Sequence, residues 1–132
     1  MTLPFLYDKL KNREVTIDGY KHVTRNNERL LMKRVARQPV AAHLDAGGLD
    51  FQFYMGGIYR GGCTGKENHS VTIVGYDSEA GEDYWIIRNS YGDRWGEGGY
   101  MKLPRNVQER RGKCGIAARP MYPIKRWYRP SS

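Results

Sequence analysis

The sequence predicts an α+β fold in which a twisted antiparallel β-barrel carries one clear helix. Several short segments are rich in β-branched and aromatic residues, and stretches rich in Gly, Asp, Ser and Glu separate them, which is typical of strands joined by turns. Sixteen Gly and ten Tyr favour such strands over a helical bundle. A length of 132 residues encloses one core, so these elements belong to a single domain.

The clear helix is predicted for residues 26–37. An Asn at its start is a good N-cap, and Leu30, Leu31 and Val35 give it an apolar side. Pro39 ends it, because a proline disfavours helical backbone at the residue before it. The preceding residues 1–25 are expected to form an extended segment that leads into the barrel, with one alternating piece at 14–20.

Strands are expected for six apolar runs, and a Gly47-Gly48 turn with a short helical turn at 50–54 follows the first of them. We expect residues 26–125 to form the folded domain and residues 126–132 a basic flexible tail. No apolar run approaches the ~18–20 residues of a membrane span, so no membrane partner is expected. The expected strands lie near 40–46, 57–59, 70–76, 84–89, 99–103 and 116–118.

Two of these runs predict a site. His69 opens the run to Tyr76 and Asn89 closes the run from Tyr84, with a turn-rich segment between the two runs. If the strands pair antiparallel across that turn, the first residue of one lies near the last residue of the other. An amide beside an imidazole is the arrangement that a cysteine protease uses to orient its histidine.

The motifs around this pair resemble the papain family of cysteine peptidases. The segment 68–76 is similar to the strand that carries the family's histidine, and 89–100 is similar to the family's Asn-Ser-Trp-Gly signature and the Trp-Gly-Glu that follows it. The segment 112–125 looks like the C-terminal end of the family. Upstream segments, at 15–20, 38–40 and 50–54, look most like plant enzymes close to vignain.

The resemblance implies the C-terminal half of such an enzyme. The nucleophilic Cys of the family lies in a helical N-terminal half, with the His roughly 130–150 residues further on. Here 68 residues precede His69 and none is a cysteine, so the N-terminal helical half is expected to be absent. Cys63 and Cys114 stand where the family has a disulfide. Two buried free thiols remain the alternative.

The resemblance also assigns roles to residues. His69 is expected to be the catalytic base and acid, and Asn89 to orient it. Tyr91 replaces the family's Trp, which covers the His–Asn contact, so that contact is expected to be wetter. His43 is either part of a more polar and basic substrate pocket or an exposed barrel residue. The expected substrate-binding residues are His43, Asn68, Tyr91, Trp95, Arg119 and Met121.

The expected function is proteolysis by a cysteine-type endopeptidase, with a peptide or protein substrate and an N-terminal half as partners. Without the nucleophile the chain alone is expected to be inactive. A non-catalytic peptide- or protein-binding fragment and a remnant with no folded role are the alternatives. No cofactor and no metal are expected, because Cys63 and His69 lack the second pair of ligands that zinc requires.

The net charge of +8 raises the question of nucleic acid. Eight Lys or Arg stand between 105 and 129 against Glu109 alone, but no nucleic-acid-binding motif accompanies them, so no such partner is expected. The family normally enters the secretory pathway, vacuole or extracellular space. The first seven residues lack the basic region and the long apolar stretch of a signal peptide, so the sequence assigns this chain no compartment.

Overall fold

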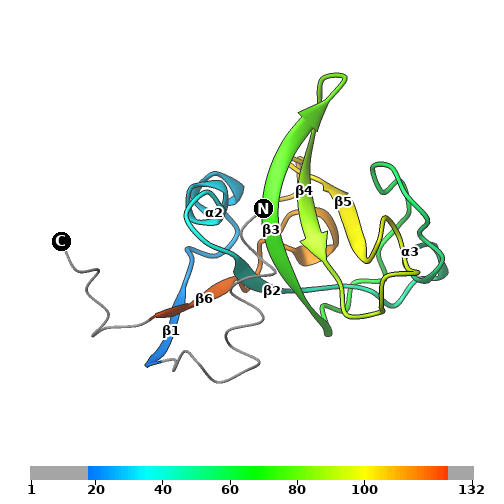
Figure 1. Cartoon of the computed structure of the whole chain (residues 1–132). Helices are drawn as coiled ribbons and strands as arrows, with labels where there is room; N and C mark the ends of the chain where they lie inside the picture. Colours follow the sequence, from blue (N-terminus) through cyan, green and yellow to red (C-terminus); the bar gives the residue numbers. More distant parts are fainter. Residues whose placement is uncertain (1–17, 125–132) are drawn as a thin grey trace.

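The structure, a computed structural model, describes residues 18–124 as one curved antiparallel sheet with a helix beside it (Figure 1). The predicted antiparallel sheet with one clear helix is confirmed, but the sheet is not closed into a barrel. Its order is β1-β6-β2-β3-β4-β5, so β1 and β5 are its two edges among the described residues. The strands are β1 Gly19–His22, β2 Val40–Leu44, β3 His69–Glu79, β4 Glu82–Arg88, β5 Tyr100–Pro104 and β6 Met121–Ile124.

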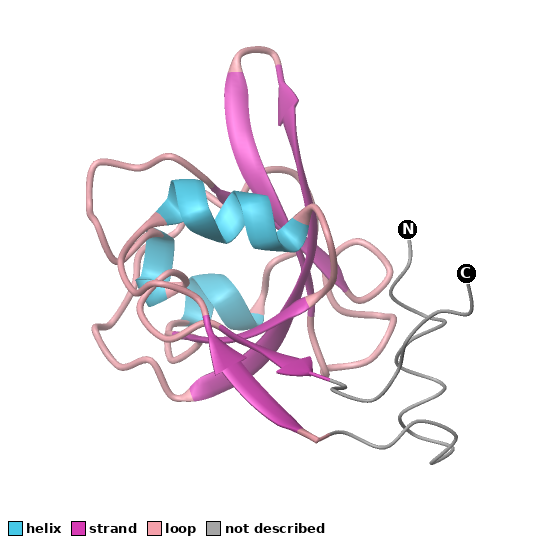
Figure 2. Cartoon of the chain, turned by 90° about the vertical axis from the view of Figure 1, so that its left-hand side faces the viewer, coloured by secondary structure: helices cyan, strands magenta, loops and turns pink. Residues whose placement is uncertain are grey.

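The hairpin of β3 and β4 forms the centre of the sheet and projects beyond the rest of the molecule (Figures 1 and 2). Both strands are longer than predicted, because residues 77–79 and 82–83 continue the ladder and leave a two-residue turn. Ala80 and Gly81 form that turn with φ of 51° and 79°. Positive φ at both positions matches the right-handed twist of a hairpin.

The predicted helix is α2, Glu28–Val35. Its N-cap is Asn27, whose Oδ1 accepts a hydrogen bond from the Leu30 N–H at 3.0 Å. Leu31 and Val35 are buried against the sheet. A second short helix, α3, covers Leu49–Gln52, and the 3-10 helix η1 covers Lys113–Gly115. Figure 2 shows the helical segments gathered on one side of the curved sheet.

The core lies between this sheet and the helical segments. Trp85 on β4 is fully buried, and its Nε1 donates to Glu28 Oε1 at 2.9 Å, which ties α2 to the sheet. Glu28 Oε2 also accepts from the Val107 N–H at 3.1 Å. The bulkiest fully buried side chains include Trp85, Phe51, Leu31, Leu44, Ile73, Ile87, Met101, Leu103 and Ile116.

Two expected strands are wrong. Residues 116–118 form turns after η1, because Ile116 has helical φ and ψ of −57° and −30° and the Ala118 N–H closes a turn onto Gly115 O at 3.0 Å. The last strand is instead β6, a few residues later. At 57–59 only Ile58 forms a bridge, to Lys102 of β5.

The expected piece at 14–20 is described only from residue 18 onward, and the expected tail at 126–132 lies outside the described residues. No helix within residues 18–124 has both the length and the apolar composition needed to cross a membrane.

Candidate active site

His69 and Asn89 meet at one end of the central hairpin. His69 is the first residue of β3, and Asn89 directly follows β4. The antiparallel register pairs Thr72 with Arg88, so the start of β3 and the end of β4 lie at the same end of the hairpin, opposite its turn. His69 Nε2 and Asn89 Oδ1 are 2.7 Å apart, a hydrogen-bond distance.

The hydrogen bonds of Asn89 determine which ring nitrogen of His69 carries a proton. The Ser90 N–H donates to Asn89 Oδ1 at 2.7 Å, so this atom is the amide oxygen. An oxygen that only accepts requires His69 Nε2 to be the donor. In the neutral ring, Nδ1 then has a free lone pair and can accept a proton.

Asn89 itself is held firmly. It is 3% exposed, and its backbone N–H donates to Gly99 O at 3.0 Å. Its Nδ2 is buried without a hydrogen-bond partner in the described part of the chain. Turning the amide would place this NH₂ against two donors, so the surroundings hold Asn89 with its oxygen toward His69.

Aromatic side chains surround the imidazole. The Tyr91 ring lies 4.9 Å from the His69 ring, and the Phe51 ring lies 6.3 Å from it. The Trp95 ring lies 5.3 Å from the Phe51 ring, tilted by 32° to it, and 5.6 Å from the Tyr91 ring. Trp95 is 8% exposed but Tyr91 is 46% exposed, so Tyr91 shields the His69–Asn89 contact on its solvent side only in part.

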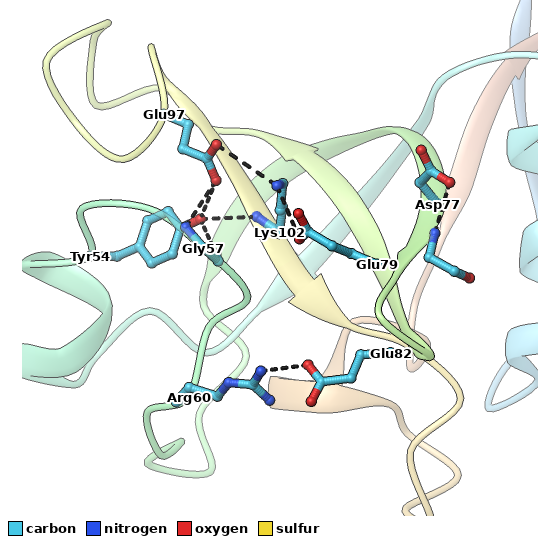
Figure 3. A network of polar contacts seen from close by, with 9 residues as sticks. Tyr54, Gly57, Arg60, Asp77, Glu79, Glu82, Glu97 and Lys102 are labelled. Atoms are coloured by element: carbon cyan, nitrogen blue, oxygen red, sulfur yellow. Dashed lines mark hydrogen bonds and ion pairs between the residues drawn. The ribbon is translucent and has the colours of Figure 1, made fainter.

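The loop that carries Tyr91 and Trp95 is fastened to α3 and to the segment after it. Trp95 Nε1 donates to Phe51 O at 3.1 Å, and the Gly96 N–H donates to Tyr54 O at 3.1 Å. Glu97 Oε2 accepts from the Gly57 N–H at 3.0 Å and lies 3.2 Å from the Tyr54 hydroxyl (Figure 3). These bonds fix the position of the rings beside His69.

The Tyr54 hydroxyl accepts from the Lys102 N–H at 3.2 Å, which connects this cluster to β5 (Figure 3). Burial and the nearby Glu97 carboxylate raise the pKa of Tyr54 to about 12, although the Lys102 N–H acts in the opposite direction. Tyr54 therefore stays protonated near neutral pH.

A second set of bonds fixes the loop that leads into His69. Cys63 and Cys114 form a disulfide, so both cysteines of the sequence are bonded to each other. Asp45, 2% exposed, accepts from the Thr64 hydroxyl at 2.6 Å, from the Gly47 N–H at 3.0 Å and from the Gly65 N–H.

Burial alone would raise the pKa of the Asp45 carboxyl. The hydrogen bonds from the Thr64 hydroxyl and from the backbone N–H groups of Gly47, Gly65 and Lys66 outweigh that effect, and they lower its pKa below the usual value. Asp45 is therefore ionised throughout the neutral range and holds the loop as a carboxylate.

Three of the expected substrate-binding residues lie around the start of β3. His43 on β2 pairs with Ser70, and its Nδ1 is buried without a partner in the described region. Arg119 is exposed, and its Nη2 donates to Glu67 O at 2.9 Å, two residues before His69. Asn68 is exposed between these two points.

The remaining expected residue of this group, Met121, lies at the start of β6, where it pairs with both Ala41 and His22. Met121 thus lies one strand further from His69 than His43 does.

Three residues of the site region, Phe51, Asp45 and Glu97, are not indicated by the sequence pattern. In the sequence, Phe51 is one apolar residue of a predicted short helical turn. That turn alone does not indicate that its ring lies 6.3 Å from the His69 ring. The two carboxylates act on loops distant in sequence, so no local pattern indicates them.

Within residues 18–124, no group of three or more His, Cys, Asp or Glu side chains comes together to hold a metal.

Most of this chain is similar to known cysteine proteases. The family described as "Papain family cysteine protease" matches residues 6–124. A KDEL-tailed cysteine endopeptidase of Arabidopsis thaliana is 54% identical over 111 residues, which are 84% of this chain and 31% of the relative. Vignain of Phaseolus vulgaris is 50% identical over 118 residues, which are 89% of this chain and 33% of the relative.

Solved structures agree. The bromelain protease from Ananas comosus, in complex with the inhibitor E64, has a TM-score of 0.78 at 44% identity and covers 81% of this chain and 50% of its own. The proform of a ragweed pollen allergen cysteine protease, Amb a 11, has a TM-score of 0.80 at 40% identity over 89% of this chain and 32% of its own. This chain spans about a quarter to a third of the length of the curated relatives.

Proposed function

We propose that this chain, which belongs to the papain family of cysteine proteases, supplies the histidine and asparagine of a cysteine-type endopeptidase active site. The observation that supports this role is the 2.7 Å contact of His69 Nε2 with an amide oxygen of Asn89. The contact leaves Nδ1 of the neutral ring free to take a proton from a nucleophile.

The nucleophile has to come from outside these 132 residues, because both cysteines of the chain are in the disulfide. A thiol beside His69 Nδ1 would lose its proton to the ring and attack the carbonyl carbon of a peptide bond. His69 would then protonate the leaving amine and, once neutral again, take a proton from the water that hydrolyses the acyl-enzyme. Asn89 would keep the ring in place through both steps.

We propose that the wall around His69 binds the peptide, with Tyr91 and Trp95 on one side and Asn68, His43, Arg119 and Met121 on the other. The unpartnered His43 Nδ1 and the Arg119 guanidinium make the latter side polar and basic. An acidic or polar side chain of the substrate fits there better than an apolar one. Peptides that differ only in Glu against Phe at that position test this, and Arg119→Ala should remove the preference for Glu.

The experiment for the catalytic role pairs this chain with an N-terminal half that carries a cysteine, such as that of the bromelain protease. The chain alone should neither hydrolyse a fluorogenic peptide nor react with E64. The pair should hydrolyse it in an E64-sensitive way, and His69→Ala should lower kcat at least about 100-fold, whereas the exposed His22→Ala should not. Equal activity of the His69→Ala pair would contradict the assignment of His69.

Hydrolysis by the purified chain alone would contradict the need for an outside nucleophile.

A non-catalytic peptide-binding fragment is the second candidate, favoured by the fact that neither cysteine is free. That function predicts peptide binding by the chain alone, measured by fluorescence polarisation, and no activity in the pair.

We propose an oxidising compartment for this chain. Its disulfide supports that location, since disulfides persist in the secretory pathway and are rare in the cytosol. The relative named for its KDEL tail agrees with it. A fluorescent fusion of this chain that stays in the cytosol would contradict this placement.

A further inference from the structure

We propose that a groove beside α2, remote from the His69 site in the sequence, is a binding site for an acidic polysaccharide with carboxylate groups. The groove has a volume of about 370 Å³ and lies between α2 and the paired strands β1 and β6. Figure 1 shows α2 next to these two strands. The inference does not depend on the proposed peptidase role.

The lining of the groove has one sign of charge. Four basic or titratable side chains of the described residues line it, and within residues 18–124 no Asp or Glu does: His22 from β1, Lys33 and Arg34 from α2, and Arg37 from its C-terminal end. None of the salt bridges within residues 18–124 involves Lys33, Arg34 or Arg37. The three permanent cations of this lining repel one another, and an anionic ligand would relieve that repulsion.

The cations come from adjacent parts of the chain. Lys33 and Arg34 lie in the last turn of α2, and Arg37 lies in the turn after it, where its N–H donates to Arg34 O at 2.9 Å. Arg34 is held over the Tyr122 ring, with its guanidinium carbon 4.1 Å from the ring centroid. A stacked guanidinium keeps its N–H groups free at the edge, where they match a carboxylate in two parallel hydrogen bonds.

The walls of the groove are fixed to each other. Gln38, just after α2, donates from Nε2 to Pro123 O of β6 at 3.3 Å. The Val23 N–H, just after β1, donates to Pro120 O at 3.0 Å. These bonds hold the backbone of the two walls in place. Ligand binding therefore costs less conformational entropy of the protein than it would between mobile walls.

The lining favours a saccharide over other polyanions. Its polar groups include the Thr24 hydroxyl and the His22 ring, which suit sugar hydroxyl groups between the carboxylates. A single-stranded nucleic acid needs an aromatic face on which bases stack, and Arg34 lies over one face of Tyr122, the only Phe, Trp or Tyr of residues 18–124 that lines the groove.

The test uses the full chain and a fluorescein-labelled hexagalacturonate, followed by fluorescence polarisation at low and moderate salt. Lys33→Gln with Arg37→Gln should weaken binding at least tenfold and reduce its salt dependence. The matched control is Lys66→Gln with Arg94→Gln, two exposed residues outside the groove that remove the same charge, and it should change affinity less than twofold.

Equal weakening by the two double variants would overturn the proposal, since net charge alone would then explain binding. Unlabelled hexaglutamate or a single-stranded DNA hexamer that displaces the probe more effectively than unlabelled hexagalacturonate does would overturn the choice of a saccharide. Amide shifts in the wild-type chain provide a readout that needs no variant. The probe should perturb residues 22, 33, 34 and 37, and shifts confined to other residues would overturn the site.

Discussion

Loss of the Cys63–Cys114 disulfide should destabilise the fold by about 4 kcal/mol in the chain-entropy account of a cross-link. The two cysteines are 51 residues apart, and the bond removes the freedom to separate them in the unfolded chain. For a urea m-value of about 2 kcal/mol per molar, the midpoint of unfolding should fall by about 2 M. Distortion of the native state usually makes the measured loss smaller.

The structure adds a local consequence. Cys63 lies on the exposed loop that Asp45 holds through Thr64 and Gly65, and Cys114 belongs to the buried η1. The disulfide and Asp45 thus fasten the same loop just before His69. Reduction should loosen this loop before the rest of the sheet, and its amides should lose protection from hydrogen exchange first.

The assay is urea unfolding of the oxidised chain, the chain reduced with a phosphine, and the variant Cys63→Ala with Cys114→Ala. Reduction keeps the sulfur atoms, so it separates the cross-link from the packing of Cys114. The variant is the matched control, because the reductant should leave its midpoint unchanged. Oxidised and reduced chains that differ by less than about 0.5 kcal/mol would refute the entropic reasoning.

Two further predictions concern the carboxylates that brace the site. Asp45→Asn should cost about 1–3 kcal/mol at pH 7. Because the pKa of Asp45 is lower in the folded chain than the ordinary 3.8, its stabilisation is complete above pH 3.8 and is lost as the pH falls from there through the lower folded-state pKa, so the cost should shrink in that range. Urea midpoints at pH 7 and pH 3 measure this, with the exposed Asp50→Asn as control; a pH-independent difference would count against it. Glu97→Gln should bring the pKa of Tyr54 down from about 12 but keep it above 10, since burial persists after the negative charge is gone. Ultraviolet titration of tyrosinate measures the change. Glu79→Gln is the control, because Glu79 accepts from Lys102 Nζ and is not among the groups that shift the pKa of Tyr54, so it should leave that pKa unchanged.

Much of the fold follows from local pattern. The helix at 28–35, its Asn cap and the central hairpin were predicted because periodicity and capping are properties of neighbouring residues. The last strand was predicted at 116–118, whereas the structure has it at 121–124. A proline within a run argues against a strand, but Pro123 of β6 pairs with Tyr20 of the edge strand β1. Whether the sheet closes depends on how strands distant in the sequence meet, and no local pattern encodes that.

The site divides in the same way. His69 and Asn89 stand at the ends of two consecutive strands, so antiparallel pairing was enough to bring them together. The parts that fix them in place, such as the Glu97 bond to Gly57 or the Trp95 bond to Phe51, join segments about 40 residues apart. These contacts depend on the loop path, which composition and spacing do not specify.

Exposed apolar side chains lie on the surface that leads to the imidazole. Leu49, Phe53 and Met55 are 69%, 68% and 87% exposed around α3, and Tyr91 is 46% exposed over the imidazole. Buried Phe51 lies 6.3 Å from both His69 and Tyr91, so this apolar surface continues toward the imidazole. A hydrogen bond between a histidine and an amide orients the ring best where water cannot compete for it. The His69–Asn89 bond is buried on the Asn89 side, but on the other side the half-exposed Tyr91 ring covers it. The strength of the bond should therefore depend on how well a bound molecule keeps water away from Tyr91.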